Sequence, residues 1–533
     1  MKIEKISIKN YRSIVDLELK PQYLCALVGE NNSGKSNILT AINLLLGESW
    51  PTIRHITDDD IYNKETKRDI EIKIWFDQRI PYQDATGRDF EISGFLLKYS
   101  HYKRQSGRHT KGDPKIDVCC IDSSGKEIEV IKRLPKKGSG QRPHPEILYL
   151  TSEWREMFPV VFIGINRDLK YHLSGSQWTL FGKLLKEIEK DFISDNDRKN
   201  QYISKMNEIS ALLRIPIFQN LENLIEQNVK KQTGLSQAKL NFKDPQVIDH
   251  YKNLVLTVKE SNEYGEFSAL EMGMGIQSAI VIALIQAYKE LQKSGGILLI
   301  EEPEVYLHPH TRRYFYQLLK SIAEQGNQVF YTTHSVEFVD LSNFDYVTVV
   351  RKDPTNGTKV FQPLTLSIKK NTREELKLLT EFDYRRNELF FARKVLLVEG
   401  PTEKYSLPYA FNLFNVDINE RGISLIDSGS KENIPFFIKI MSAFGIPFVV
   451  LHDEDRNANN YTTYHNGPNG LNKKIEQSLS ANDLVFKMDP DFEGIFQFSQ
   501  KSILEARNKL KSLTDRSQLP QVIQNAISKL LSI

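Results

Sequence analysis

The stretch YLCALVGENNSGKSNILTAINLLLG, residues 23–47, predicts a buried strand, a glycine-rich loop and an amphipathic helix. Its loop matches G-x-x-x-x-G-K-[ST], a pattern whose backbone N–H groups wrap phosphates at the N-terminus of a helix. In this pattern the lysine, Lys35, neutralises phosphate charge and the serine, Ser36, holds Mg²⁺. We therefore expect a nucleotide site formed by Gly29, Asn31, Asn32, Ser33, Gly34, Lys35 and Ser36.

An acidic strand end supplies the next part of this site. Residues 296–309, GILLIEEPEVYLHP, begin with an apolar strand that ends in Glu301 and Glu302. Carboxylates at the carboxyl edge of a parallel sheet face the ligand crevice. We expect Glu301 to support Mg²⁺ through water and Glu302 to orient or deprotonate the attacking water. Another buried strand, in QVFYTTHS (328–335), places His334 where it can contact a γ-phosphate.

The segment EMGMGIQSAI, residues 271–280, has two glycines just before a helical apolar run. Taken alone, this pattern is also typical of the turn before a helix, but the backbone there can bind an anion. The candidate nucleotide contacts are Gly273, Gly275 and Gln277. The order of these motifs resembles that of the SMC/RecF-like branch of ABC ATPases. The resemblance implies that this segment of one head completes the nucleotide site of another in a head dimer.

A second group of acids follows at two further strand ends. VLLVEGPTEKY (395–405) runs from a buried strand into Glu399 and then Glu403, and IPFVVLHDEDR (446–456) ends in Asp453 and Asp455. Alternation along an extended chain predicts that both Asp side chains point the same way, with Glu454 opposite. Paired carboxylates at two strand ends favour hard cations such as Mg²⁺ or Mn²⁺.

The Glu-Gly…Asp-x-Asp pattern resembles the Toprim domain of topoisomerases, primases and some nucleases. An SMC/RecF-like ABC ATPase followed by Toprim resembles the OLD (overcoming lysogenisation defect) family of nucleases over nearly the whole chain. The resemblance implies that four acids bind divalent metal ions that activate water for phosphodiester cleavage: Glu399, Glu403, Asp453 and Asp455. It also implies a further downstream acid, Glu493, with Asp489 or Asp491 as competitors, a basic residue such as Lys501 or Lys509, and a phosphate contact near Ser428, Gly429 and Lys431.

These patterns define an α/β fold with an ABC-type ATPase domain, a helical insert and a Rossmann-like Toprim domain. We expect the ATPase in residues 1–175 and 256–370, a helical dimerisation insert at 176–255, a linker at 371–393 and Toprim at 394–533. Residues 98–144 are rich in Lys and Arg. That basic segment is either a solvated loop or a patch that contacts DNA phosphates.

Composition excludes several classes of protein. The net charge is +3, from 71 basic and 68 acidic side chains, so bulk charge neither demands nor excludes nucleic acid. Three cysteines, Cys25, Cys119 and Cys120, lack the spacing of a structural zinc site and indicate a reducing compartment. The sequence lacks a signal-peptide pattern and an apolar run long enough to span a bilayer, which favours the cytoplasm.

The leading hypothesis is an ATP-binding and ATP-hydrolysing, metal-dependent DNA endonuclease or nickase of an anti-phage or DNA-processing system. Its cofactors would be ATP and Mg²⁺, with Mn²⁺ or Ca²⁺ as alternatives at the Toprim site. Its partners would be DNA, further copies of the chain and, in some settings, another protein or nucleic acid. The alternative is a DNA-binding ATPase whose Toprim region only binds metal or senses it.

Overall fold

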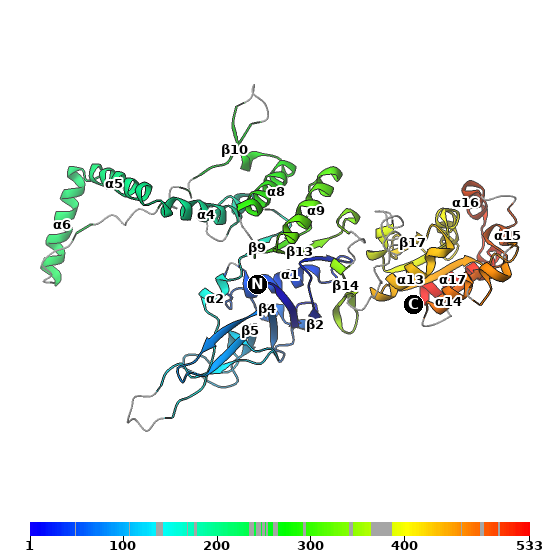
Figure 1. Cartoon of the computed structure of the whole chain (residues 1–533), viewed down its shortest axis with the longest axis horizontal. Coiled ribbons are helices and arrows are strands. Elements are labelled where there is room, and N and C mark those ends of the chain that lie inside the picture. Colours follow the sequence, from blue (N-terminus) through cyan, green and yellow to red (C-terminus); the bar gives the residue numbers. More distant parts are fainter. Residues whose placement is uncertain are drawn as a thin grey trace. The chain divides into compact units, whose positions relative to one another are not determined.

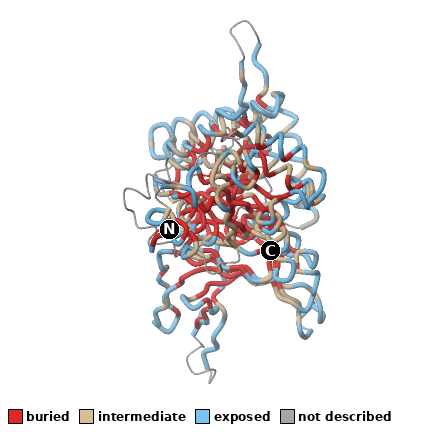
Figure 2. Tube along the Cα trace, turned by 90° about the vertical axis from the view of Figure 1, so that its right-hand side faces the viewer, coloured by how far each residue is buried: buried red, intermediate tan, exposed pale blue. Residues whose placement is uncertain are grey.

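The computed structural model describes residues 1–533 apart from 48, 106, 135–141, 168, 175–178, 234–238, 241–246, 248–250, 252–253, 260–264, 292–294, 340–344, 364–385, 460, 469, 480–483 and 499–501. It divides the chain into two compact units, one of residues 1–165 with 295–533 and one of residues 166–294. Most strand residues of the first unit are buried. Figure 2 draws the buried residues of the chain in red. No helix among the described residues is long and apolar enough to cross a membrane.

The larger sheet of the first unit has eleven strands, and the five strands at one end of its spatial order are parallel (Figure 1). In spatial order they are β6 (Pro114–Ile121), β5 (Asp89–His101), β4 (Ile70–Gln83), β1 (Ile3–Tyr11), β2 (Ile14–Leu19), β15 (Gly357–Phe361), β14 (Val347–Asp353), β3 (Leu24–Val28), β13 (Gln328–Thr333), β12 (Ile297–Glu301) and β9 (Val160–Ile163). All five residues of β3 are buried, as a continuous apolar run in a parallel sheet requires.

The helix that follows the glycine-rich loop is α1 (Lys35–Leu46), which buries Ile38, Leu39, Ile42 and Leu45 at helical spacing. The residue before it, Gly34, has φ of +105°, and a Cβ there would lie 2.2 Å from Thr358 Oγ1. Only glycine fits this turn. A second long helix of the unit, α9 (Pro309–Glu324), buries Phe315, Leu319 and Ile322. Shorter elements are α2 (Ser152–Glu156), β7 (Glu129–Val130) and β8 (Glu146–Ile147).

The C-terminal sheet has four parallel strands in the order β17 (Ile423–Asp427), β16 (Lys394–Val398), β18 (Phe448–Asp453) and β19 (Val485–Met488). Side chains of β16 and β18, among them Leu396, Val449 and Leu451, share a core with Ile523 and Ile527 of the last helix. The helices of this region are α11 (Pro401–Ser406), α12 (Pro408–Asn412), α13 (Ile434–Ala443), α14 (Leu471–Gln477), α15 (Phe492–Phe496), α16 (Ile503–Ser512) and α17 (Gln521–Ser532).

The second unit is mainly helical: α3 (Leu169–His172), α4 (Leu180–Ser194), α5 (Asn196–Leu212), α6 (Pro216–Thr233), the short strands β10 (Thr257–Val258) and β11 (Phe267–Ser268), and α8 (Met274–Leu291). Within it α8 packs against α3 and α4. Helix α5, all of whose residues are described, buries none of them. Large apolar side chains of α5 and α6 and their connection stay in solvent: Ile203, Ile209, Leu212, Leu213, Ile215, Ile217, Leu221 and Leu224.

Candidate functional site

The glycine-rich loop holds its lysine in place with its own carbonyls. Lys35 is 5% exposed, and its Nζ donates to Gly29 O at 2.9 Å and to Glu30 O at 2.6 Å. Burial lowers the pKa of Lys35 to about 8, although the nearby carboxylates of Glu302, Glu304 and Glu30 act to raise it. A lysine held beside the loop in this way can pair its ammonium group with a phosphate bound there.

The acids of β12 lie at the same sheet edge as the loop because β13 pairs with both β12 and β3 in parallel register. Burial raises the pKa of Glu301, whereas the nearby Ser36 hydroxyl acts to lower it. Ser36 and Glu301 are the two residues assigned to Mg²⁺. Both side chains offer the hard oxygen atoms that Mg²⁺ prefers, so the residues present fit this ion.

His334 follows β13 and faces the same group of acids. Its Nε2 lies 3.9 Å from Glu302 Oε1, and its backbone N–H donates to Glu304 Oε1 at 2.6 Å. Burial, with the charge of Lys35, lowers the pKa of His334 to about 4, so the imidazole is neutral at pH 7. The structure thus places the side chains of Lys35, Glu302 and His334 near one another.

Glu304 was missed by the sequence analysis, although it is the third acid of EEPE. It is 7% exposed, and burial raises the pKa of its carboxyl group. The hydrogen bond from the His334 backbone to Glu304 links the segment after β12 to the segment after β13. Glu304 therefore fixes the backbone position from which the His334 side chain extends.

The segment 271–280 lies in the second unit. Gly273 precedes α8, and Gly275 and Gln277 lie in its first turn. Gln277 Nε2 donates to Met272 O at 2.7 Å and to Leu270 O at 3.1 Å, so this side chain holds the turn before the helix. Any contact of these residues with a nucleotide stays a prediction.

The Toprim acids follow neighbouring parallel strands, β16 and β18. Glu399 comes directly after β16, and Glu403 lies in α11, 5% exposed. Gly400 lies beneath Glu403, since a Cβ at position 400 would be 3.4 Å from Glu403 Oε2. Asp453 ends β18 at 1% exposure, and its Oδ1 accepts a 2.8 Å hydrogen bond from Phe492 N.

The predicted alternation of Asp453, Glu454 and Asp455 is wrong, because β18 ends at Asp453 and Asp455 has φ of +59°. The chain is therefore not extended there. Instead, Asp455 Oδ2 lies 2.6 Å from Lys431 Nζ and 3.2 Å from His465 Nδ1. Glu454 turns to other partners and accepts a hydrogen bond from Tyr461 Oη at 2.7 Å.

The four carboxylates have the donor chemistry of a site for a hard divalent cation. In the described part of the chain, however, no three His, Cys, Asp or Glu side chains are grouped closely enough to hold a metal ion as they stand. Among these carboxylates, Asp453 accepts a hydrogen bond from Phe492 N, and Asp455 accepts one from Lys431. A bound cation would have to compete with these contacts or add to them.

The downstream candidates separate by their contacts. Asp489 forms a 2.8 Å ion pair with Arg456, and Asp491 caps α15 by accepting a 2.7 Å hydrogen bond from Gly494 N. Glu493 lies in the first turn of α15, one residue after the N–H that binds Asp453. Lys509 is exposed on α16, and Lys501 lies outside the described residues.

Asp427 is an acid of this edge that the sequence analysis missed, although SLID ends a buried strand. Its Oδ2 accepts a hydrogen bond from Lys404 Nζ at 2.7 Å, and its Oδ1 accepts one from Arg386 Nη2 at 2.9 Å. Burial alone would raise the pKa of Asp427, but these two cations lower it below its usual value. Asp427 is therefore a paired carboxylate, held by a side chain from α11 that neighbours Glu403.

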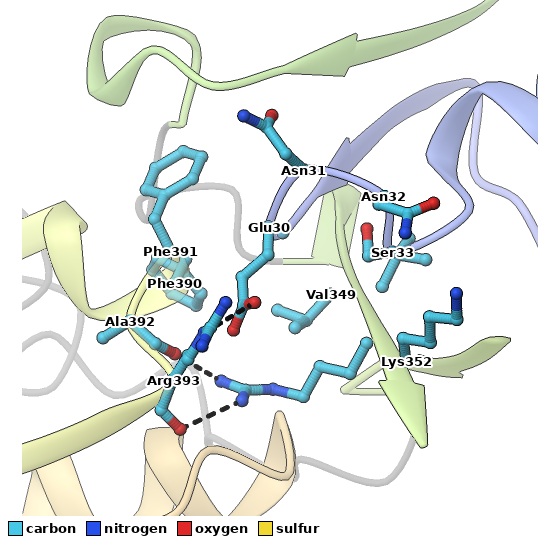
Figure 3. A pocket seen from close by; sticks show the side chains of 13 residues that line it. Glu30, Asn31, Asn32, Ser33, Val349, Lys352, Phe390, Phe391, Ala392 and Arg393 are labelled. Atoms are coloured by element: carbon cyan, nitrogen blue, oxygen red, sulfur yellow. Dashed lines mark hydrogen bonds and ion pairs between the residues drawn. The ribbon is translucent and has the colours of Figure 1, made fainter. Parts of the chain in front are cut away.

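A pocket of about 280 Å³ lies beside the glycine-rich loop (Figure 3). Residues 29–33 of the loop, residues 349–352 at the end of β14 and residues 390–393 before β16 line it. Arg351 Nη2 donates to Ala392 O at 2.9 Å, and Arg393 Nε lies 2.9 Å from Glu30 Oε2. Arg393 thus links the loop of the nucleotide site to the segment that enters β16, and Arg351 links β14 to the same segment.

Comparison with known proteins identifies a separate family for each of the two regions that carry these sites. A family described as "AAA domain, putative AbiEii toxin, Type IV TA system" matches residues 24–340, and "Overcoming lysogenization defect protein-like, TOPRIM domain" matches residues 390–455. The OLD nuclease of Thermus scotoductus is 32% identical over 85% of this chain and 82% of its own length.

Two further relatives match less closely. The Old nuclease of Escherichia phage P2 is 25% identical over 98% of this chain and 90% of its own length. Endonuclease GajA of Bacillus cereus (strain HuB5-5) is 22% identical over 69% of this chain and 54% of its own length.

Proposed function

The chain belongs to the OLD nuclease family, with an AAA ATPase domain and a Toprim domain, and from this premise we propose that it is a metal-dependent DNA endonuclease regulated by ATP. The observation that carries the proposal is the pair of acidic sheet edges, one beside a phosphate-binding loop and one in the Toprim domain. The first fits phosphoanhydride hydrolysis and the second fits phosphodiester hydrolysis.

In the ATPase site each residue has a role that its position supports. Lys35 neutralises phosphate charge, and Ser36 with Glu301 would hold Mg²⁺. Glu302 orients or deprotonates the attacking water, and neutral His334 contacts the γ-phosphate. The signature residues Gly273, Gly275 and Gln277 would contact nucleotide in a head dimer.

In the Toprim site Glu399, Glu403, Asp453 and Asp455 would hold divalent cations, with Glu493 as the further acid. When bound, such ions supply water activation and stabilisation of the leaving oxygen. The chain's own contribution is to orient these carboxylates: Phe492 N fixes Asp453, and the SGSK loop after β17 fixes the neighbouring backbone, since Ser428 Oγ donates to Glu399 O at 3.2 Å.

Coupling between the two sites is supported by the contacts beside the pocket. Arg351 and Arg393 join residues next to the nucleotide loop to the backbone that enters β16. A change in the loop on nucleotide binding would therefore act on the strand that presents Glu399. We infer that nucleotide state sets the activity of the Toprim site through this connection.

Two surfaces support further partners. The apolar side chains of α5 and α6 that stay in solvent are the kind of patch that a second copy of the chain covers, as a dimerisation insert would require. The connection between β5 and β6 carries exposed Lys103, Arg104 and Arg108, which fit DNA phosphates. A role in anti-phage defence or DNA processing belongs to the same proposal.

A nicking assay tests the proposal. Supercoiled plasmid is incubated with purified protein and Mg²⁺ or Mn²⁺, with and without ATP, and open-circle product is measured. The wild type should nick, Asp453→Ala should not, and Glu454→Gln should, because Glu454 faces Tyr461 rather than the other acids. Nicking that survives in Asp453→Ala contradicts the assignment of the site. A wild type that binds DNA and hydrolyses ATP without any cleavage would favour the alternative, a DNA-binding ATPase with a metal-sensing Toprim region.

A further inference from the structure

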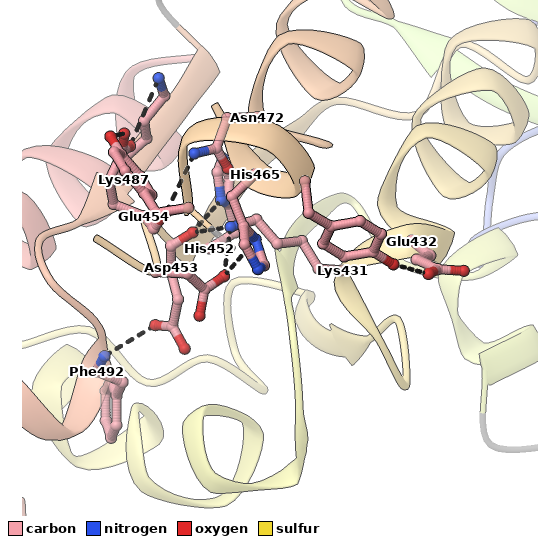
Figure 4. A network of polar contacts seen from close by, with 12 residues as sticks. Lys431, Glu432, His452, Asp453, Glu454, His465, Asn472, Lys487 and Phe492 are labelled. Carbon is pink, nitrogen blue, oxygen red and sulfur yellow. Dashed lines mark hydrogen bonds and ion pairs between the residues drawn. The ribbon is translucent and has the colours of Figure 1, made fainter. Parts of the chain in front are cut away.

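The ammonium group of Lys431 lies at the carboxyl edge of the C-terminal sheet, in contact with the 453–455 turn (Figure 4). Lys431 is 4% exposed and begins a short helical turn after the SGS loop of β17. Its Nζ donates to Asp453 O at 2.5 Å and to Asp455 Oδ2 at 2.6 Å. A buried cation is thus already bound to one of the carboxylates assigned to metal binding.

The surroundings of this ion pair hold it firmly. Asp455 N donates to Pro490 O at 2.7 Å, which fixes the turn with positive φ that presents the carboxylate. His465 Nδ1 lies 3.2 Å from the same Oδ2, and Lys431 also spans the turn through the Asp453 carbonyl. The ammonium group therefore bridges the backbone of one proposed ligand and the side chain of another.

We propose that Lys431 and a divalent metal ion compete for Asp455, so that Lys431 sets the metal affinity of the Toprim site. The inference rests on the proposed function only in taking Asp455 as a metal ligand. The Lys431 ammonium occupies Asp455 Oδ2, and it would repel a divalent ion bound to the same carboxylate because both carry positive charge. Full metal binding through Oδ2 therefore requires Lys431 to withdraw.

Removal of Lys431 would change the metal affinity of the site in opposite directions for a competing role and for a purely structural role. If Lys431 only braces the turn, its removal loosens Asp455 and weakens metal binding. If Lys431 competes, removal of its charge strengthens metal binding. Lys487, in the same domain, is a matched control. It forms ion pairs with Glu454 and Glu476, which are not among the proposed metal ligands.

Mn²⁺ binding to the full-length protein, measured by isothermal titration calorimetry, separates the two roles. Lys431→Gln keeps an N–H donor for the Asp453 carbonyl and removes the charge, and Lys487→Gln is the control. We expect Lys431→Gln to bind Mn²⁺ about tenfold more tightly or better, with Lys487→Gln unchanged. Unchanged or weaker binding in a folded Lys431→Gln protein would overturn the proposal.

A measurement on the wild type does not depend on whether any variant folds. Amine acetylation followed by mass spectrometry reports the accessibility of each lysine, and Mn²⁺ should raise the rate at Lys431 but leave Lys487 unchanged. Protection of Lys431 that persists at saturating Mn²⁺ would contradict competition. Neither readout uses DNA, so a protein that passes both and never nicks would refute the nuclease proposal and leave this inference standing.

Discussion

At the scale of single residues, the two sites place buried charges where strands end. Lys35, Glu304, Asp453 and Lys431 are each less than one tenth exposed, and each has a partner that the chain itself supplies. Buried charges are tolerated only when they are paired or hydrogen-bonded. The partners fix the orientation of these side chains in the structure, and a preorganised site of this kind would lower the barrier of the proposed reactions.

Glu304 gives a prediction at this scale because it holds the backbone of His334. Glu304→Ala removes the acceptor for the His334 N–H, whereas Glu304→Gln retains one. We expect Glu304→Ala to lower kcat for ATP hydrolysis by about a hundredfold, as misplacement of a reacting group does, with little change in nucleotide Kd. Glu304→Gln should keep most of the wild-type rate. Equal loss in both variants would show that the charge of Glu304, and not its contact with His334, matters.

The lowered pKa of Lys35 predicts a stability effect with a defined pH range. Because the folded-state pKa of about 8 lies below that of the unfolded chain, the folded state carries a penalty at low pH that is relieved as pH rises from about 8 toward the ordinary lysine value. Lys35→Met should therefore raise the Tm without nucleotide at pH 7, by a few degrees. This gain should shrink as pH rises through that range in thermal unfolding followed by fluorescence. A gain that is constant with pH would contradict the account.

At the scale of elements, the sequence specifies most of the scaffold. The apolar run of β3, the glycine at position 34 and the periodic apolar face of α1 predict the nucleotide loop, and the structure shows these elements. Short apolar runs likewise predict β12, β13, β16 and β18. These patterns involve residues close together in the sequence, so a single sequence is enough to predict the elements.

What the sequence could not supply is the geometry just beyond the strand ends. Glu302 and Asp455 both have positive φ, which is costly for a residue other than glycine and which strand alternation does not anticipate. The contacts of Lys431 with Asp455 and of Glu304 with His334 join residues 24 and 30 positions apart. Such contacts depend on how neighbouring strands align, and no local pattern encodes that alignment.

The connection beside the pocket gives a prediction for these elements. Arg351 donates to Ala392 O and Arg393 O, at the entrance to β16. Arg351→Ala should leave ATP hydrolysis close to the wild-type rate but abolish the effect of ATP on plasmid nicking. Lys352→Ala, a neighbour that lines the same pocket, is the control and should retain the effect. An unaltered ATP effect in Arg351→Ala would exclude this connection as the route of coupling.

At the scale of the whole molecule, the exposed cations between β5 and β6 predict a DNA-contacting arm. The triple charge reversal Lys103→Glu, Arg104→Glu and Arg108→Glu should weaken DNA binding and reduce the slope of log K against log salt by up to about 3. The matched control reverses three exposed cations of α5: Arg198, Lys199 and Lys205. Fluorescence anisotropy over a salt series measures both. An unchanged slope in the first variant would mean that this connection is simply solvated.

The two enzymatic parts of the chain together imply that the ATPase controls the Toprim site. In the proposed function Lys35 contacts the nucleotide, and the loop that holds Lys35 is joined through Glu30 to Arg393. Loss of Lys35 should therefore remove nucleotide sensing and leave the Toprim acids in place.

The most direct test compares initial rates of plasmid nicking by wild type and Lys35→Ala, each with and without ATP at fixed Mg²⁺. The account predicts that ATP changes the wild-type rate and leaves the Lys35→Ala rate unaltered. If Lys35→Ala nicks at the wild-type rate and responds to ATP as the wild type does, control of the nuclease by the ATPase is contradicted.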